Sequence, residues 1–285
     1  MRVLVLGVTG MLGSAVFRVF SEKPEFSVWG TLRNSSAQRF FPSNKHSHLI
    51  TNVDVLDQDS LVAIFQRVKP NVVINCVGLI KQLENAKDPL TVLPINAMLP
   101  HRLSKLCALI GARLIHVSTD CVFSGSKGGY HEFDLSDAED LYGKSKFIGE
   151  LHEDTHAITL RTSIIGHELN STNALLGWFL SQNGTVNGYS KAVFSGLPTV
   201  ELARVMRDYV IPNSKLHGLY HVSAKPIAKL NLLRLISIQY GKDIEIRPND
   251  SLVIDRSLNS ERFTNVTGYV APEWPDLIKL MHQYL

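Results

Sequence analysis

The chain has 285 residues, and 29 Lys and Arg against 26 Asp and Glu give it a formal net charge of +3. This even balance, without a run of basic residues, argues against binding to nucleic acid. Hydrophobic residues make up 45% and charged residues 19%, as in an ordinary globular protein. No apolar stretch reaches the roughly 18 residues that a membrane helix needs, so we expect no membrane partner.

Three cysteines, Cys76, Cys107 and Cys121, stand far apart and form no CxxC pair. An odd number of separated cysteines is typical of a reduced, cytoplasmic protein rather than of a disulfide-stabilised secreted one. The apolar residues 3–6 are followed by glycines and by no small-residue cleavage site, so we do not expect them to form a signal peptide. We therefore expect a cytoplasmic protein. The histidines lack the spacing of metal ligands, so we expect no catalytic metal.

Short apolar segments alternate with helical patterns through the first half of the chain. Such alternation predicts βαβ units in an α/β fold of Rossmann type, with a doubly wound parallel sheet covered on both faces. We expect strands at residues 3–6, 27–32, 49–55, 72–76, 113–118 and 158–162, and helices at residues 11–20, 57–68, 97–110 and 141–153.

Glycines at positions 7, 10 and 13 follow the first predicted strand and open the first predicted helix. In this context glycines allow a tight turn, a close approach of backbone N–H groups to a pyrophosphate, and close packing of helix on strand. The helix N-terminus adds a positive potential that favours phosphate. A glycine-rich turn without a ligand is the alternative. The predicted dinucleotide-binding residues are Gly7, Thr9, Gly10, Met11, Leu12 and Gly13.

The end of the second predicted strand indicates which dinucleotide is bound. An enzyme specific for NAD usually has an acidic residue there, but this segment continues as Arg33-Asn34-Ser35. A guanidinium and neighbouring polar side chains can bind the 2′-phosphate of NADP. We therefore expect NADP(H) to be preferred, with NAD(H) as the second choice. The alternative for Arg33 is a solvated loop charge.

Two further strand ends could contact the cofactor, because ligands of open parallel sheets bind beyond the carboxyl ends of the strands. Asp54 and Val55 end the third predicted strand, where adenine could lie, although Asp54 could equally cap the next turn. Cys76, Val77 and Gly78 end the fourth predicted strand. We include all five residues in the predicted cofactor site.

Tyr142 and Lys146 are four residues apart, so on a helix they share one face. A nearby ammonium stabilises a phenolate and lowers the pKa of tyrosine, which makes the phenol a better proton donor. Lys146 could also bind the nicotinamide ribose. Thr119 follows the strand at residues 113–118 and offers a hydroxyl to the same carbonyl oxygen. The alternative is a surface tyrosine beside a solvated lysine.

The second half of the chain alternates less regularly. We expect residues 1–163 to form the dinucleotide-binding domain and residues 164–285 to form mainly a smaller substrate-binding lobe, with some segments returning to the sheet. Residues 166–196 are rich in Asn, Ser and Gly, which predicts loops around this lobe. Helices are expected at residues 200–210 and 226–240, and a strand at residues 219–222.

In combination, these motifs resemble those of the extended short-chain dehydrogenases/reductases, and within that group the dTDP-4-dehydrorhamnose reductase-like sugar-nucleotide reductases. The resemblance implies a catalytic triad of Thr119, Tyr142 and Lys146. It also implies hydride transfer from NAD(P)H to the C4 ketone of a nucleotide-linked 4-keto-6-deoxysugar, in deoxysugar and polysaccharide biosynthesis. The matching segments are the three glycines, residues 116–123 (HVSTDCVF), residues 142–150 (YGKSKFIGE) and residues 161–163 (RTS).

The resemblance extends to a substrate site and to one more residue near the cofactor. It places Asp120, Val122 and Phe123 beside Thr119 and Tyr142 as substrate-binding residues. Two further assignments have alternatives. Arg256 would bind the substrate diphosphate, or else pair with Asp255 or Glu261 at the surface; Asn96 would support the proton path near the cofactor, or else cap a helix.

Three readings of this site remain open at this point. A reductase consumes NADPH, whereas an epimerase or dehydratase on the same fold retains its NAD(P). Cys121 stands where dehydratases usually have Glu, which disfavours a dehydratase. A non-catalytic, NADP-binding regulatory subunit is the third reading, because fold does not fix function. The sugar, its nucleotide, the hydride stereochemistry and the oligomeric state, for which a homodimer is one option, are left open.

Overall fold

A seven-stranded parallel sheet forms the centre of the computed structural model, which describes residues 1–80 and 87–284. The strand order is β11-β6-β5-β4-β1-β2-β3. This order confirms the predicted Rossmann-type, doubly wound sheet. The strands are β1 (Arg2–Leu6), β2 (Ser27–Thr31), β3 (Leu49–Ile50), β4 (Val72–Asn75), β5 (Arg113–Thr119), β6 (Ala157–Thr162) and β11 (Gly218–His221).

The strand order reverses between β1 and β4, which lie side by side in the middle of the sheet. From β1 the chain first builds outward through β2 and β3, and then returns to build β4, β5 and β6 on the other side. Loops that leave adjacent strands at such a point diverge to opposite faces and open a crevice beyond the carboxyl ends. The glycine loop after β1 and the segment after β4 border this crevice.

Separate apolar cores cover the two faces of the sheet. Buried side chains of α1 (Met11–Ser21), α7 (Thr199–Val205) and α10 (Trp274–Gln283) belong to one core. Those of α2 (Gln58–Val68) and α4 (Leu99–Ile110) belong to the other. The strands contribute to both cores because successive side chains point to opposite faces. The prediction of a sheet covered on both sides is therefore confirmed.

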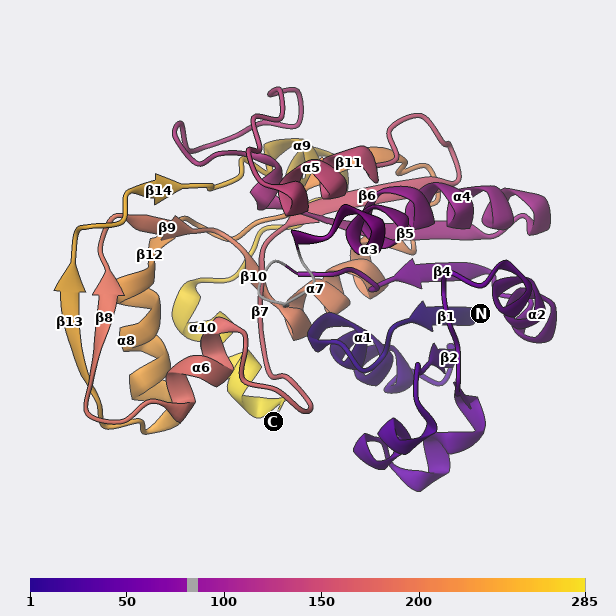
Figure 1. The fold of residues 1–285 in the computed structure, drawn as a ribbon, viewed down its shortest axis with the longest axis horizontal. Helices are drawn as coiled ribbons and strands as arrows, with labels where there is room; N and C mark the ends of the chain where they lie inside the picture. The colour runs from indigo at the N-terminus through magenta and orange to yellow at the C-terminus, as the bar shows by residue number, and fades with distance from the viewer. Residues whose placement is uncertain (81–86, 285) are drawn as a thin grey trace.

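Beyond the sheet, the chain forms a smaller lobe that lies to the left in Figure 1. Here β8 pairs with β13, while β9 pairs with both β12 and β14. The expectation that residues 166–196 form only loops is wrong, because α6, β8 and β9 fall within this range. The elements of this lobe are α6 (Leu175–Ser181), β8 (Thr185–Tyr189), β9 (Ala192–Phe194), β12 (Ile227–Ala228), α8 (Lys229–Tyr240), β13 (Glu245–Asn249) and β14 (Ile254–Asp255). β7 (Ile164–Ile165) and β10 (Leu197–Pro198) lie between the lobe and the sheet, and α9 (Glu261–Thr267) packs against β11.

The lobe and the sheet are interleaved in sequence. The predicted strand at residues 219–222 is observed as β11, which extends the sheet beside β6. α7, followed by a π-helical turn η6 (Met206–Val210), packs against α1 and confirms the helical prediction for residues 200–210. The helix predicted from residue 226 begins only at Lys229, because residues 227–228 pair with β9. The division at residue 163 stays a prediction.

Three predicted elements end or begin elsewhere, each for a local reason. The third strand stops at Ile50 because Asn52 adopts a left-handed φ of 58°. The helix predicted over residues 141–153 is α5 (Leu141–Ile148), which stops before Gly149. The helix predicted from residue 97 is α4, preceded by α3 (Pro89–Leu93) and a π-helical turn η4 (Pro94–Met98).

Within the described residues, no helix is both long and apolar enough to cross a membrane.

Candidate active site at the carboxyl edge of the sheet

The glycine loop packs so tightly on itself that side chains are excluded. Gly7 has a φ of 79° and donates its N–H to Thr31 Oγ1 at 3.0 Å, while Gly10 N donates to Gly7 O at 3.1 Å. A Cβ at Gly13 would lie 2.1 Å from Gly7 O. Glycine at position 13 thus allows α1 to start directly against the end of β1. Thr31 was not predicted from the sequence, where it is an ordinary strand residue.

The first turn of α1 offers free backbone donors to an anion. Its N-cap is Gly10, which makes no side-chain capping bond, and the first turn contains no acidic residue. The N–H groups of a first helical turn have no partner within the helix and lie at its positive end. Leu12 is buried in the core, so it can serve a ligand only through its backbone. This cradle fits the pyrophosphate of a dinucleotide.

The side chains after β2 are available to a ligand, whereas the one at Asp54 is engaged. Arg33, Asn34 and Ser35 are all exposed. Asp54 Oδ1 accepts Leu56 N at 2.9 Å, which confirms the turn-capping alternative for this residue. Val55 is half-buried and packs against the α2–α4 core. The structure thus leaves a cation and two polar side chains exposed after β2.

Asn96 fastens the loop after β4 to α5. Its Oδ1 accepts Leu79 N at 2.9 Å, and its Nδ2 donates to Leu79 O at 3.0 Å and to Ser145 Oγ at 3.2 Å. Because Asn96 lies inside η4 and is buried, the helix-cap alternative is wrong. Cys76 and Val77 are half-buried at the end of β4, and Gly78 is exposed there.

The predicted catalytic groups meet where β5 ends and α5 begins. The helix starts at the N-cap Asp140, whose Oδ1 accepts Gly143 N at 2.7 Å. A Cβ at Gly143 would lie 2.2 Å from Cys121 O, so glycine lets α5 press against the turn after β5. In this arrangement the Thr119 hydroxyl lies close enough to the Tyr142 phenol to lower its pKa. Lys146, one turn further along α5, is buried and donates Nζ to Val117 O at 2.7 Å.

Burial dominates the electrostatics of the tyrosine and lysine. It raises the pKa of Tyr142 above its ordinary value; the nearby Cys121 adds to this rise, and the Thr119 hydroxyl opposes it. Burial lowers the pKa of Lys146 to about 8, against the effects of Glu150 and Cys76. Burial thus outweighs any lowering by Lys146, and the expectation of a lowered Tyr142 pKa is wrong in this geometry. At neutral pH the phenol is protonated and the amine is mostly charged.

Some predicted substrate residues form the floor of the site rather than its lining. Val122 and Phe123 are fully buried and pack with Tyr130 and Leu258, with the Phe123 and Tyr130 rings stacked 4.1 Å apart. Their side chains are thus not exposed to a substrate. Asp120 is half-buried and accepts the Thr119 hydroxyl at 3.1 Å.

Arg256 is brought to the catalytic groups from far along the chain. Its Nε donates to Phe123 O at 2.7 Å, and its Nη1 lies 3.9 Å from Cys121 Sγ. Asp255 Oδ1 instead accepts Ser257 N at 2.9 Å, and among the described residues no ion pair joins Arg256 to Asp255 or Glu261. A half-buried guanidinium therefore stands beside the Cys121 turn.

Sequence reasoning missed a buried polar cluster behind the catalytic groups. Glu150 forms an ion pair with Arg161 of β6, with Arg161 Nη2 and Glu150 Oε2 2.5 Å apart. Ser118 Oγ donates to Glu150 Oε1 at 2.5 Å, and Arg161 Nη1 lies 2.9 Å from His221 Nε2. Glu150 and Arg161 stand in the recognised motifs, but no feature of the sequence pairs them.

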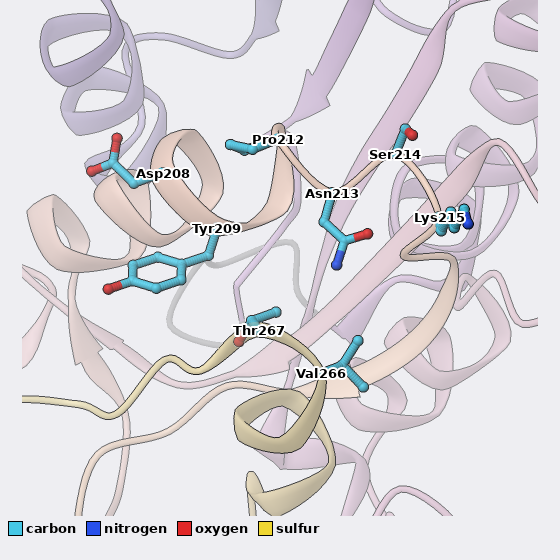
Figure 2. A pocket seen from close by; sticks show the side chains of 8 residues that line it. All are labelled: Asp208, Tyr209, Pro212, Asn213, Ser214, Lys215, Val266 and Thr267. Carbon is cyan, nitrogen blue, oxygen red and sulfur yellow. The ribbon is translucent and has the colours of Figure 1, made fainter.

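A hollow of about 490 Å³ lies elsewhere on the molecule, between η6, the loop that precedes β11 and the end of α9 (Figure 2). It is lined by residues such as Tyr209, Asn213 and Thr267. None of the predicted site residues lines it. Because this loop enters β11 at its amino end, the hollow is at the opposite edge of the sheet from Tyr142. In the described part of the chain, no three His, Cys, Asp or Glu side chains gather as a metal site.

The model of the family described as the RmlD substrate binding domain matches residues 1–253. The chain belongs to this family. The predicted resemblance to extended, dTDP-4-dehydrorhamnose reductase-like short-chain dehydrogenases/reductases is thereby confirmed. The match includes the glycine loop, the Tyr142–Lys146 helix and most of the smaller lobe.

Known proteins similar to this RmlD-family chain carry two different names. Methionine adenosyltransferase 2 subunit beta of Xenopus tropicalis is 32% identical over 167 residues, which cover 58% of this chain and 47% of the relative. The chain thus matches about half the length of such relatives. The dTDP-4-dehydrorhamnose reductase of Aggregatibacter actinomycetemcomitans is 24% identical over 234 residues, which cover 79% of this chain and 74% of the relative.

Among solved structures, dTDP-4-dehydrorhamnose reductase from Bacillus anthracis in complex with NADP superimposes with a TM-score of 0.78. The two chains are 20% identical, and the similarity covers 99% of each. A likeness at this level of identity establishes the fold of the RmlD-family chain along its whole length.

Proposed function

We propose that this protein is an NADPH-dependent reductase that reduces the C4 ketone of a nucleotide-linked 4-keto-6-deoxysugar. One observation carries the proposal: the Tyr142 phenol and the Thr119 hydroxyl lie next to each other at the carboxyl edge of the sheet, with a buried Lys146 one helical turn away. The names of the Aggregatibacter and Bacillus relatives support this substrate class.

The cofactor assignment rests on two parts of the chain. The backbone of the glycine loop and the uncapped first turn of α1 would hold the pyrophosphate. Exposed Arg33, Asn34 and Ser35 would hold the 2′-phosphate of NADP, in line with the NADP bound to the Bacillus relative. NADPH, when bound, supplies the hydride for the carbonyl carbon. NAD(H) would lack the contacts made to the 2′-phosphate.

The chain itself supplies the proton. The raised pKa of Tyr142 keeps the phenol protonated at neutral pH. The Thr119 hydroxyl positions the ketone oxygen against this phenol, and Tyr142 gives its proton to that oxygen as the carbonyl carbon becomes an alcohol carbon. The Lys146 ammonium stabilises the phenolate that remains until Tyr142 regains a proton from solvent.

The sugar nucleotide would be bound between the sheet edge and the smaller lobe. Arg256 stands beside the Cys121 turn with its guanidinium half-buried, and would bind the substrate diphosphate. Residues 164–285 would thus form mainly a substrate-binding lobe. Three free, well-separated cysteines agree with a cytoplasmic location.

The test is a screen in which the protein and NADPH are mixed with dTDP-, UDP- or GDP-linked 4-keto-6-deoxysugars. Oxidation of NADPH is monitored by the absorbance of its nicotinamide. We expect at least one sugar to be converted to its alcohol with one NADPH consumed for each product. The Tyr142→Phe variant is the control for a contaminating reductase. Sugar conversion without net NADPH loss would instead establish an epimerase, and no conversion in any arm would overturn the proposal.

A non-catalytic subunit is the second candidate. It is favoured by the similarity to proteins named as the beta subunit of methionine adenosyltransferase 2. The intact Thr119, Tyr142 and Lys146 set favours the reductase, because a binding module does not need this pairing. Complementation separates the two: a cell lacking the gene and rescued fully by the Tyr142→Phe variant would support the subunit, whereas a failed rescue by a stable variant supports the reductase.

A further inference from the structure

We propose that Glu150 is a positioning residue for the reaction: its buried carboxylate, fixed by Arg161 and Ser118, keeps the neighbouring Lys146 amine protonated. This inference deepens the proposed function and rests on it. Glu150 follows the end of α5, and both side chains reach adjacent residues of β5: Lys146 Nζ donates to Val117 O at 2.7 Å, and Glu150 Oε1 accepts Ser118 Oγ at 2.5 Å.

The carboxylate of Glu150 is held in a single place. It is fully buried, and Oε1 accepts both Ser118 Oγ at 2.5 Å and Arg161 Nε at 2.9 Å. Its Oε2 accepts Arg161 Nη2 at 2.5 Å, which completes a bidentate pair. His152 also faces it, with Nε2 3.7 Å from Oε2. Because a guanidinium does not lose its proton in proteins, Arg161 supplies a permanent counter-charge to this buried carboxylate.

The rest of the cluster adds no further charge. Arg161 Nη1 can only donate, so His221 Nε2 must accept, and the His221 proton resides on Nδ1, which donates to Tyr130 O at 3.0 Å. Burial, with the Arg161 charge, lowers the pKa of His221 to about 3. His221 is therefore neutral throughout the working range, and the cluster consists of one anion and one cation.

Glu150 is the negative charge that Lys146 needs. Burial drives the pKa of Lys146 down, and Glu150 is the first group that opposes this effect. Three other groups near Lys146 are neutral at neutral pH: burial raises the pKa of Cys76 to about 12 and that of Tyr142 above its ordinary value, and lowers that of His116. Among these described neighbours, only Glu150 favours the charged amine at neutral pH.

The charge on Lys146 matters because a neutral amine cannot stabilise the phenolate that Tyr142 becomes. With a pKa of about 8, Lys146 is charged below pH 8 and loses its proton as the pH rises above it. Turnover should therefore fall on the alkaline side of pH 8. Removing the carboxylate should move this fall to lower pH, while binding of NADPH and sugar changes little.

The experiment compares two substitutions in the full chain, one at each member of the Glu150–Arg161 pair. Glu150→Gln removes the anion but keeps its shape, and we expect the alkaline limb of kcat to move down by about one pH unit, with KM nearly unchanged. Arg161→Gln removes the counter-charge of the buried carboxylate, which then takes up a proton, so the limb should move down as well. A structural role would instead lower kcat in both variants without moving the limb, and that result would overturn the inference.

A second readout does not need turnover. In protein labelled with ¹³C at lysine Cε, the Lys146 signal, assigned by its loss in Lys146→Met, reports the amine titration directly. We expect a midpoint near pH 8 in the unmodified chain and a lower one in Glu150→Gln. If no sugar is reduced but the midpoint shifts, only the proposed function fails. If sugars are reduced and the midpoint does not shift, only this inference fails.

Folding of the variants has its own control. Glu150→Gln leaves Arg161 buried without its anion, which can be strongly destabilising. The double variant Glu150→Gln/Arg161→Gln removes both charges and leaves two amides that can hydrogen-bond. It should show the same lowered Lys146 midpoint as the single Glu150 variant, and a midpoint equal to that of the unmodified chain would overturn the inference.

Discussion

The glycine loop and the catalytic edge lie at the same end of the sheet but are built in different ways. The loop is one continuous stretch whose shape comes from backbone packed on backbone, with the position of a Gly13 Cβ only 2.1 Å from Gly7 O. The catalytic edge gathers side chains from distant segments, such as Thr119, Tyr142 and Arg256, around buried polar groups. The glycine loop should therefore be disrupted by substitutions that add atoms. The catalytic edge should be disrupted by substitutions that remove charges or hydrogen bonds.

The difference predicts that a defect at one region should leave the other intact. The largest expected effect is at the catalytic edge. Tyr142→Phe keeps the ring but removes the proton donor, so kcat should fall by roughly 10²–10⁴ while NADPH affinity is unchanged. Steady-state kinetics with the sugar identified in the screen, together with titration calorimetry for NADPH, measure both quantities. Full turnover by the variant would remove Tyr142 from the mechanism.

A smaller effect is expected at the end of β2. Arg33→Asp replaces a cation suited to the 2′-phosphate by an anion suited to the ribose hydroxyls. The ratio of kcat/KM for NADPH over NADH should fall by roughly 10- to 100-fold, the loss of one charge-assisted hydrogen bond. The pH dependence of kcat should be unaffected because Lys146 is untouched. An unchanged cofactor ratio would show that Arg33 is only a solvated loop charge.

The smallest expected effect concerns the glycine loop, where two substitutions distinguish the packing of α1 on β1 from the binding of NADPH. Gly13→Ala forces a Cβ against Gly7 O and should cost about 1–3 kcal/mol of stability, measured by urea unfolding. Gly10→Ala is the matched control, because its Cβ would meet only Gly7 O at 3.4 Å in an ordinary backbone conformation.

We expect Gly10→Ala to retain its stability and to bind NADPH more weakly, since the added methyl stands where the pyrophosphate approaches. Equal losses of stability in the two variants would show that the loop does not divide these two tasks.

What the sequence predicts well is local. β1 and α1 are observed within one or two residues of their predicted bounds, because apolar spacing and the glycine pattern act over neighbouring residues. β3 is shorter than predicted because the left-handed Asn52 ends a segment whose composition still favours a strand. The π-helical turn around Asn96 has no pattern of its own and follows from its bonds to Leu79 and Ser145.

What the sequence does not predict is set by contacts across the sheet. The spacing of Tyr142 and Lys146 gives their shared helix face, but not the burial that raises one pKa and lowers the other. Glu150, Arg161 and His221 come from three segments, and each alone is an ordinary polar residue. Only the pairing of β6 with β5 and β11 brings them together.

The position of β11 at the outer edge of the sheet also constrains how the chain can be made. When a growing polypeptide has left the ribosome only as far as β6, Arg161 is present without its partner His221. One edge of β6 also has no neighbouring strand to pair with, because β11 has not yet been made. The α1 face is likewise bare until α7 emerges. Completion of the native sheet therefore waits for residues more than fifty positions downstream, and an isolated fragment that stops at residue 163 should aggregate rather than fold.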